Sequence, residues 1–357
     1  MDALTTPLPK DWQKVRLGDI LTLKHGRDYK NFKLGNIPVY GSGGYMLSIN
    51  NFLHNGESVC IGRKGTIDKP IYLNGKFWVV DTLFYSYSFK KSIPKFIFYA
   101  FSIIKWSNYN EATGVPSLTK MTISNIEIPL PPLNEQAAIA NVLSDVDHYL
   151  HSLRALILKK ESVKKALSFE LLSQRKRLKG FNQAWQRVRL RDIANYLTSN
   201  LSAEQITQQG KIKVYDVNNF IGYTDTTFIS DKPYISIVKD GSVGRVRILP
   251  PKTNILSTMG ALIANHKTTT EFLFYLLSNF DFKNFTSGSI IPHIYFKDYK
   301  EKTIFLPPLN EQIAIANILS DVDSEIISLK NKRRQFENVK KALNHDLMSA
   351  EIRVLKK

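Results

Sequence analysis

Residues 128–147, IPLPPLNEQAAIANVLSDVD, and residues 304–323, IFLPPLNEQIAIANILSDVD, form a near-identical internal repeat. The two stretches differ only at the pairs Pro129/Phe305, Ala137/Ile313 and Val142/Ile318. They lie 176 residues apart in the chain. This long separation indicates a duplicated domain, because solenoid repeats are shorter and occur in larger numbers.

Shorter matches extend the repeat in both directions. VKKAL at residues 163–167 returns at residues 339–343, at the same offset. WQKVRLGDI at residues 12–20 matches WQRVRLRDI at residues 185–193. Each copy therefore opens with a tryptophan-led segment and ends with the near-identical stretch and its extension.

The near-identical stretch predicts the start of a helix in each copy. Two prolines precede an asparagine that can cap a helix, and a glutamate follows in the first turn, where the helix dipole favours it. These residues are Pro131, Pro132, Asn134 and Glu135 in the first copy and Pro307, Pro308, Asn310 and Glu311 in the second.

An apolar seam with alternating spacings of four and three residues continues from each helix start. Its positions are Ile139, Leu143, Val146, Leu150, Leu153, Ile157, Lys160, Lys164, Leu167 and Leu171 in the first copy, and Ile315, Leu319, Val322, Ile326, Leu329, Arg333, Phe336, Lys340, Leu343 and Leu347 in the second. This period predicts a coiled coil of about 50 Å. The alternative is an amphipathic helix packed only on its own domain. We favour mutual packing because two nearly identical stripes in one chain can pair with each other. An antiparallel pair fits the chain order, since parallel helices would need the second domain to span back along the first helix.

The order domain, helix, domain, helix predicts an α+β fold, with two duplicated globular α/β domains separated by two long helices in an antiparallel coiled coil with pseudo-twofold symmetry. The predicted limits are residues 1–132 for the first globular domain, 133–180 for the central helix, 181–308 for the second globular domain and 309–357 for the C-terminal helix. Two domains held apart by stiff helices suit a bipartite site on DNA, whose grooves repeat every ~34 Å.

The chain is strongly basic. It contains 49 lysines and arginines against 31 aspartates and glutamates among 357 residues, which gives a net charge of +18. The excess is spread over both copies, so it favours a polyanion such as nucleic acid as partner. A soluble protein that is merely basic is the alternative.

The remaining composition narrows the class of protein. Hydrophobic residues make up 43% and charged residues 22%, as in folded globular proteins. The single cysteine, Cys60, excludes an internal disulfide and favours a reducing cytoplasm. Since no apolar stretch is long enough to cross a bilayer, we expect a cytoplasmic protein without a membrane segment.

No catalytic motif is complete in this sequence. The glycines at residues 41–44 do not continue into a dinucleotide-binding pattern, and Phe77 follows Gly75-Lys76 where a phosphate-binding loop needs serine or threonine. The LPPL tetrapeptides lack the Asn or Asp with which adenine methyltransferases accept the target amino group. His148 and His151 have no third ligand nearby, so neither a catalytic nor a metal site is predicted.

Two glycine-containing loops carry the candidate DNA contacts. GRKGTI at residues 62–67 supplies Arg63, Lys64 and Gly65, and KDGSVGRVR at residues 239–247 supplies Lys239, Arg245 and Arg247. Glycine lets the backbone approach a duplex closely, and arginine can hold a guanine edge or a phosphate. For each charged residue a solvated hairpin tip is the alternative.

Two further loops lie at corresponding points of the copies. TGVPS at residues 113–117 contains Ser117, and SGSIIPH at residues 287–293 contains His293. Each side chain is a candidate for reading a base edge, and an ordinary turn is the alternative. Residues 24–92 share little with residues 197–268 although the flanking segments match, which indicates two different recognition surfaces on a repeated frame.

The doubled LPPLNEQ opening of a long helix, the WQxVRLxDI segment of each half and the GRKGTI loop together resemble the specificity subunit of type I restriction-modification enzymes. The resemblance covers nearly the whole chain. It implies two target-recognition domains that each read one part of a split DNA sequence, and helices that fix the spacing between them. Asp240 stands opposite Lys64 in the second half, where the family pattern leads us to expect a matching loop.

The resemblance also implies partners and cofactors. Two modification subunits would dock on the conserved helices, and restriction subunits would join them. S-adenosylmethionine, ATP and Mg are expected on those partner subunits and not on this chain. The helix-start residues assigned to docking are Asn134, Glu135, Gln136, Asn310, Glu311 and Gln312. The alternatives are a stand-alone methyltransferase, a non-catalytic DNA-binding regulator and an interaction scaffold.

Overall fold

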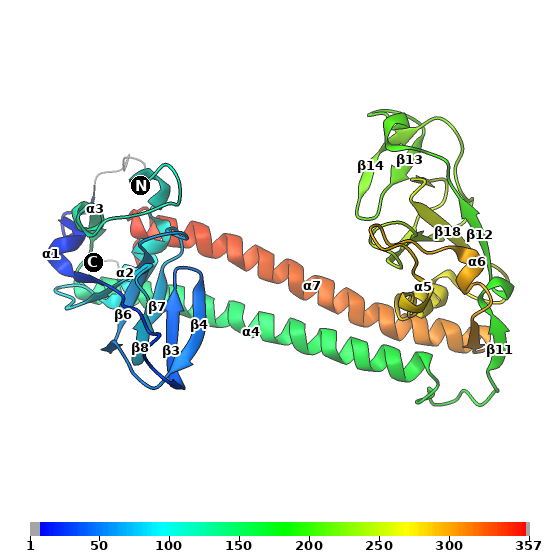
Figure 1. Cartoon of the computed structure of the whole chain (residues 1–357), viewed down its shortest axis with the longest axis horizontal. Coiled ribbons are helices and arrows are strands. Elements are labelled where there is room, and N and C mark those ends of the chain that lie inside the picture. Colours follow the sequence, from blue (N-terminus) through cyan, green and yellow to red (C-terminus); the bar gives the residue numbers. More distant parts are fainter. Residues whose placement is uncertain (1–7, 355–357) are drawn as a thin grey trace. The chain divides into compact units, whose positions relative to one another are not determined.

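The structure, a computed structural model, describes residues 8–354 and divides into two compact units. Unit 1 combines the residues up to Arg154 with those from Asn331 onward, and unit 2 comprises Ala155–Lys330. Two long helices, α4 (Leu133–Leu172) and α7 (Leu309–Met348), each contribute one part to each unit. Figure 1 shows the two helices and the sheets of each unit.

Unit 1 holds a strand pair and two sheets. β1 (Gln13–Arg16) pairs antiparallel with β10 (Glu127–Leu130) directly before α4. One sheet has the order β2-β9-β6-β7, with the bounds Thr22–His25, Leu83–Tyr87, Ser58–Gly62 and Ile71–Leu73. The other has the order β4-β3-β8-β5, with the bounds Gly44–Ile49, Leu34–Gly41, Lys76–Val79 and His54–Asn55. The short helices are α1 (Leu17–Ile20), α2 (Pro94–Ile103), η1 (Trp106–Tyr109) and α3 (Lys120–Asn125).

Unit 2 repeats this plan. β11 (Gln186–Arg189) pairs antiparallel with β19 (Thr303–Leu306) directly before α7. One sheet has the order β12-β18-β15-β16, with the bounds Ala194–Thr198, Met259–Ala264, Tyr234–Val238 and Val246–Leu249. The other has the order β14-β13-β17, with the bounds Phe220–Thr224, Ile212–Tyr215 and Asn254–Ile255. The short helices are η2 (Leu190–Asp192), η3 (Ala203–Gln205), α5 (Thr270–Ser278), η4 (Lys283–Phe285) and α6 (Phe296–Tyr299).

Each unit has its own apolar core, which joins a globular part to pieces of both long helices. In unit 1, Ile139 and Leu143 of α4 and Leu347 of α7 are buried together with α2. In unit 2, Leu171 of α4 and Ile315 of α7 are buried with α5. Since burial of one such side chain is worth about 1.5–3 kcal/mol, the helices are structural parts of both units.

The predicted antiparallel packing of the helices is confirmed within each unit. In unit 1, Lys340 Nζ lies 2.5 Å from Asp147 Oδ1, and the rings of Tyr149 and Phe336 are 4.7 Å apart. In unit 2, Lys164 Nζ lies 2.5 Å from Asp323 Oδ1. Residue numbers of the contacting side chains fall along α7 as they rise along α4, as expected for antiparallel helices. The two lysine–aspartate pairs are related by the repeat, because a shift of 176 residues converts Lys164 to Lys340 and Asp147 to Asp323. This reciprocity is what pseudo-twofold pairing predicts.

The helix limits differ from the predicted ones. α4 begins at Leu133 as predicted but ends at Leu172, whereas the predicted segment runs to residue 180. α7 ends at Met348, whereas the predicted segment runs to residue 357. Asn134 and Asn310 therefore lie inside the first turn and are not the caps. The carbonyl of Pro132 accepts the N–H of Gln136 instead, because the proline already stands at the helix boundary.

Among residues 8–354, no helix combines the length and the apolar composition that a membrane crossing requires.

Candidate functional site

The predicted contact residues of the first half come together where two loops meet. The Arg63 N–H donates to Thr82 O at 2.8 Å, and the Leu118 N–H donates to Arg63 O at 2.9 Å. The Gly65 N–H donates to Pro116 O at 2.9 Å, and Lys64 forms a β-bridge with Ser117. We call residues 63–65 with 116–118 the unit 1 crossing.

The second half contains the same junction. The Ile294 N–H donates to Lys239 O at 2.9 Å, and the Gly241 N–H donates to Pro292 O at 2.8 Å. Asp240 forms a β-bridge with His293. We call residues 239–241 with 292–294 the unit 2 crossing.

The two crossings are equivalent residue by residue. Lys239 takes the place of Arg63, and Asp240 takes the place of Lys64, as the sequence comparison indicated. Gly65 and Gly241 have φ angles of +83° and +84°, a region that a residue with a Cβ rarely adopts. A shared backbone frame thus presents different side chains in the two units.

The arginines differ in how they are held. Arg63 Nη1 donates to Asp81 O at 3.1 Å, while Lys64 is exposed. Arg247 Nη1 donates to Asn218 O at 3.0 Å, and its guanidinium lies 5.2 Å from the centre of the Tyr215 ring. These contacts fix the Arg247 side chain before any ligand is present.

Each unit has a hollow beside the turn of its β3–β4 or β13–β14 hairpin. The unit 2 hollow, of about 210 Å³, is lined by Asn218, Ser236, Arg245 and Arg247 among others. The unit 1 hollow, of about 810 Å³, is lined by residues 28–30, 41–46 and 80–82. Lys239 lines a different hollow of unit 2, of about 350 Å³, together with Tyr196, Tyr295 and Lys297 among others, and not the one lined by Arg245 and Arg247.

Sequence reasoning missed part of the unit 1 hollow. Tyr45 and Met46 line it and are exposed, although both are apolar or aromatic. The signal available was their place directly after the Gly41-SGG segment, a variable glycine-rich loop.

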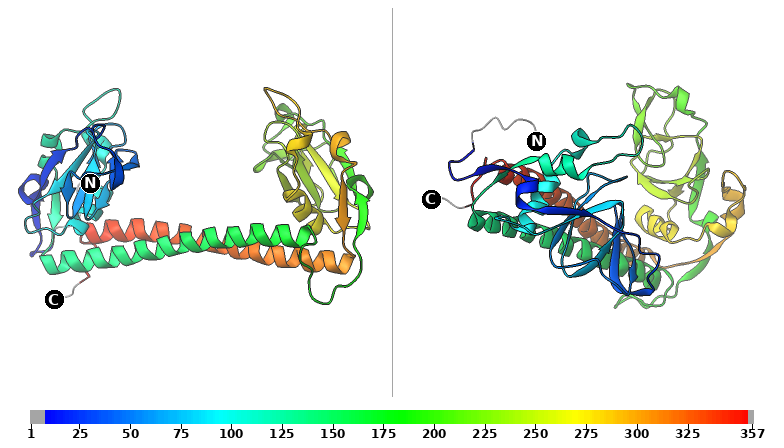
Figure 2. Two further views of the ribbon diagram at one scale, coloured as in Figure 1. Left: turned by 60° about the horizontal axis from the view of Figure 1, so that its bottom comes forward. Right: turned by 60° about the vertical axis from the view of Figure 1, so that its left-hand side comes forward.

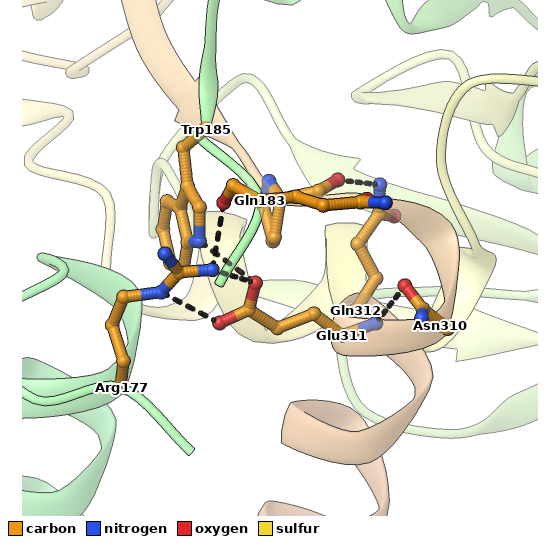
Figure 3. Close-up of polar contacts among 7 residues, drawn as sticks. Arg177, Gln183, Trp185, Asn310, Glu311 and Gln312 are labelled. Atoms are coloured by element: carbon orange, nitrogen blue, oxygen red, sulfur yellow. Dashed lines mark hydrogen bonds and ion pairs between the residues drawn. The ribbon is translucent and has the colours of Figure 1, made fainter. Parts of the chain in front are cut away.

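A buried polar cluster lies at the start of each long helix, and Figure 3 shows the one at the start of α7. In unit 2, Glu311 accepts hydrogen bonds from Trp185 Nε1 at 3.0 Å and from Arg177 Nη2 at 2.6 Å. In unit 1, Glu135 accepts from Trp12 Nε1 at 3.1 Å and from Arg353 Nη2 at 2.7 Å. Hydrogen bonds from Arg353 to the carboxylates of Glu135 and Asp11 raise the pKa of its guanidinium.

The neighbouring glutamines complete each cluster. Gln136 accepts from the Ile93 N–H at 2.9 Å and donates to Pro131 O at 2.8 Å. Gln312 accepts from the Thr269 N–H at 3.1 Å and donates to Pro307 O at 2.8 Å. These bonds fix the helix start against the globular part of its own unit.

The docking role predicted for the helix starts is corrected by this burial. Glu135, Gln136, Glu311 and Gln312 are buried and bonded within their own units, so they are not available to a partner. Asn134 and Asn310 are exposed and remain candidates. The missed members of the clusters, Arg177 and Arg353, are themselves 176 residues apart, and that offset was the signal that would have found them.

A tyrosine of each globular part also bonds to the helices. The Tyr99 hydroxyl donates to Asp147 at 2.8 Å, and the Tyr275 hydroxyl donates to Asp323 at 3.0 Å. Burial, together with these carboxylates, raises the pKa of both tyrosines. Each aspartate therefore receives a hydroxyl from its own unit and a lysine from the opposite helix.

His148 and His151 are both exposed on α4. Within residues 8–354, the group whose ligand atoms lie within 4.8 Å of one another is His345 and Asp346 in the last turn of α7 with Glu351 just after it. Exposed acidic groups of this kind are common without an ion, and we assign it no function.

Comparisons with known proteins agree with this architecture. A family model described as "Type I restriction modification DNA specificity domain" matches residues 9–161 and 182–337. The chain is 25% identical to the type I restriction enzyme MjaVIII specificity subunit of Methanocaldococcus jannaschii over 414 residues, which cover 97% of this chain and 94% of that protein.

Two solved structures share the fold. The S subunit of a type I restriction-modification system from M. genitalium has a TM-score of 0.69 and 19% identity, covering 96% of this chain and 98% of that one. The second is a chain from a structural study of complex assembly and conformational transition of the type I R-M system. It has a TM-score of 0.58 and 15% identity, covering 96% of this chain and 99% of that one.

Proposed function

The chain belongs to the type I restriction modification DNA specificity family, and we propose from this premise that it reads a bipartite, asymmetric DNA site, with one globular domain for each half-site. The observation that carries the proposal is the pair of crossings. The same backbone hydrogen bonds recur in both units, while Arg63-Lys64 is replaced by Lys239-Asp240 and Ser117 by His293. If each domain reads a different DNA sequence, the two crossings need the same backbone geometry but different side chains toward the bases.

We propose that this chain is not itself catalytic. Its sequence lacks a cofactor loop and an acceptor for a target amino group, and its family is named for specificity. Methyl transfer from S-adenosylmethionine would take place on modification subunits, and ATP and Mg would act on restriction subunits. Purified chain alone should incorporate no labelled methyl group into DNA, and robust incorporation would contradict the proposal.

The long helices are proposed to set the spacing between half-sites and to dock two modification subunits. Exposed apolar side chains recur on them at the 176-residue offset, at Leu133 and Leu309 and at Val163 and Val339. Because these side chains are not needed by the cores, they suit a protein partner. The regulator and scaffold alternatives are not favoured by the relatives.

Genome-wide mapping of methylated adenines tests the reading of DNA. In cells that contain this chain and its modification subunit, single-molecule sequencing should reveal one motif with two specified parts and an unread spacer. Exchanging residues 12–127 for the equivalent domain of a relative should change one half-site only. A change in both half-sites would reject a modular reading, and the absence of any such motif would reject the proposed function.

A further inference from the structure

Two seven-residue loops, 111–117 and 287–293, are closed by the same hydrogen bond. The Glu111 N–H donates to Ser117 O at 3.1 Å, and the Ser287 N–H donates to His293 O at 2.9 Å. Both loops end in their unit's crossing. In the left view of Figure 2, each of these segments projects from its own unit on the side away from the long helices.

Both loops are held stiffly by further bonds. In the first loop, Asn110 Oδ1 accepts from the N–H groups of Ala112 at 3.2 Å and of Ser117 at 2.9 Å. In the second, the His293 N–H donates to Ser287 O at 2.8 Å, and His293 Nδ1 lies 3.1 Å from Ile291 O. A ligand that meets such a loop does not have to order it, which preserves binding free energy.

The base of the first loop has an additional anchor. The carboxylate of Glu111 accepts hydrogen bonds from the hydroxyls of Thr122 and Thr119. These bonds, led by that of Thr122, lower the pKa of Glu111. The loop is thereby tied to α3 as well as to the crossing.

The tips of these stiff loops are apolar and face solvent. Val115 is 66% exposed, its counterpart Ile291 in the second loop is 62% exposed, and the neighbouring Ile290 is 92% exposed. A single exposed apolar residue needs no explanation. Here, however, aliphatic side chains recur at the same place of a repeated frame, and the two tips differ in sequence as recognition elements do.

The surroundings of the tips indicate the ligand. Val115 is one residue from the unit 1 crossing, which presents the cations Arg63 and Lys64, and Ile291 is one residue from the unit 2 crossing with Lys239. Each loop therefore combines cations at its crossing with aliphatic side chains at its tip. This combination suits a DNA duplex, whose backbone is anionic and whose grooves expose thymine methyl groups and the apolar edges of base steps.

We infer that Val115 in unit 1 and Ile290 with Ile291 in unit 2 enter a groove of the DNA and make apolar contact with base pairs. This inference rests on the proposed function and adds the side chains that contribute to sequence reading. The lysines of the crossings hold the phosphates, and the aliphatic tips contact the bases between them.

The test compares tip variants with exposed apolar controls in the full chain with its modification subunits. The tip variants are Val115→Ser and the pair Ile290→Ser with Ile291→Ser. The controls are Leu34→Ser in unit 1 and Phe228→Ser in unit 2, both exposed and outside the loops. The probe is a 40-base-pair duplex, a length on the order of four turns of B-DNA, that carries the site found by methylation mapping.

Each tip variant should bind this duplex about 10- to 100-fold more weakly, because burial of an aliphatic side chain is lost. The dependence of affinity on salt should stay that of the parent, because no phosphate contact is removed. The mapped motif should relax at one or two positions of one half-site, the one read by the altered unit. The control variants should bind like the parent.

Parent-like affinity and motif in the tip variants would overturn the inference. So would loss of the modification subunits with an unchanged motif, which would make the tips a protein contact. If a serine variant unfolds, Val115→Ala and Ile290→Ala with Ile291→Ala supply the same comparison without a new polar group. A parent that shows no motif and no site preference would instead reject the proposed function, and the inference with it.

Discussion

Glu311 has no exposed side-chain surface, and its charge is balanced by Arg177, which follows the end of α4 in the same unit. The Arg177 guanidinium also donates to Gln183 O at 2.8 Å, so it ties the connecting segment to the start of α7. A buried carboxylate that loses its cation is costly, whereas removal of both charges is often tolerated.

Arg177→Met should therefore lower the free energy of unfolding by about 2–4 kcal/mol, as measured by urea titration. Adding Glu311→Gln to this variant should restore part of the loss, since the amide carries no charge. Lys176→Ala is the control, because its pair with Glu170 is solvent-exposed and worth less than about 1 kcal/mol. Equal losses in the Arg177 and Lys176 variants would contradict this account of the cluster.

Lys64 and Arg63 are expected to differ in their effect on DNA binding. Lys64→Ala should weaken binding to cognate and scrambled duplexes alike and lower the salt slope by about one, as loss of one phosphate contact does. Arg63→Ala should cost ~1–3 kcal/mol and relax one base position. Affinities at several salt concentrations separate the two.

The matched control is Lys14→Ala, which removes the same charge from a side chain already paired with Glu127 at 2.7 Å. If Lys14→Ala lowers the salt slope as much as Lys64→Ala does, the effect is one of net charge and the unit 1 crossing is not a phosphate contact.

The seam of the long helices was predictable from sequence, and so were its polar interruptions, but the partners of those polar side chains were not. Spacing alone places Lys164 and Lys340 in the seam, where they interrupt an apolar stripe. The structure pairs them with Asp323 and Asp147, the last residues of the near-identical stretches. This pairing depends on the register between two helices, which the pattern within one helix does not contain.

Introducing a carboxylate at two adjacent residues of α4 should have very different effects on stability. Ile157 is buried in the seam and Leu158 is exposed. Ile157→Asp should destabilise the chain by about 3 kcal/mol or more, because it buries an unpaired carboxylate. Leu158→Asp should change stability by less than about 0.5 kcal/mol. Thermal unfolding measures both, and comparable melting of the two variants would refute the assigned faces.

The exposed faces of the helices carry a separate prediction for assembly. Val163→Asp combined with Val339→Asp should leave the melting temperature near that of the parent, since both side chains are exposed, and should reduce binding of modification subunits. Native mass spectrometry reports the ratio of subunits, with two modification subunits expected for the parent. Ser162→Asp, also on the exposed surface of α4, is the control. A double variant that still forms the 2:1 complex would place docking elsewhere.

At the scale of the whole chain, the compact units do not follow the order domain, helix, domain, helix of the sequence copies. The sequence copies run from one tryptophan-led segment to the end of one helix. Unit 1, in contrast, needs Leu347 and Arg353 from the second copy, and unit 2 needs Leu171 and Arg177 from the first. The repeat offset relates Arg177 to Arg353, but neither the offset nor the periodicity of a copy says which remote residue each arginine contacts. Docking was therefore assigned to glutamates that are in fact buried.

A chain divided at Gly180, an exposed residue of the connection, tests this composite construction. The fragments 1–180 and 181–357 should co-purify when expressed together with a tag on one of them, because each unit contains helix segments from both. Either fragment alone should expose the apolar surface of Ile139 or Ile315 and bind a hydrophobic dye. Two fragments that remain separate and well folded would show that each copy forms its core alone.

Lys64 and Asp240 occupy equivalent positions with opposite charges. The unit 1 crossing presents two cations, whereas the unit 2 crossing presents one cation beside a carboxylate. Long-range attraction governs the rate of encounter more than the final affinity, so under the proposed function this difference should give binding an order in time. The domain that carries the unit 1 crossing should bind the duplex first. The second should then search for its half-site as a tethered neighbour, at a local concentration that the connecting helices set.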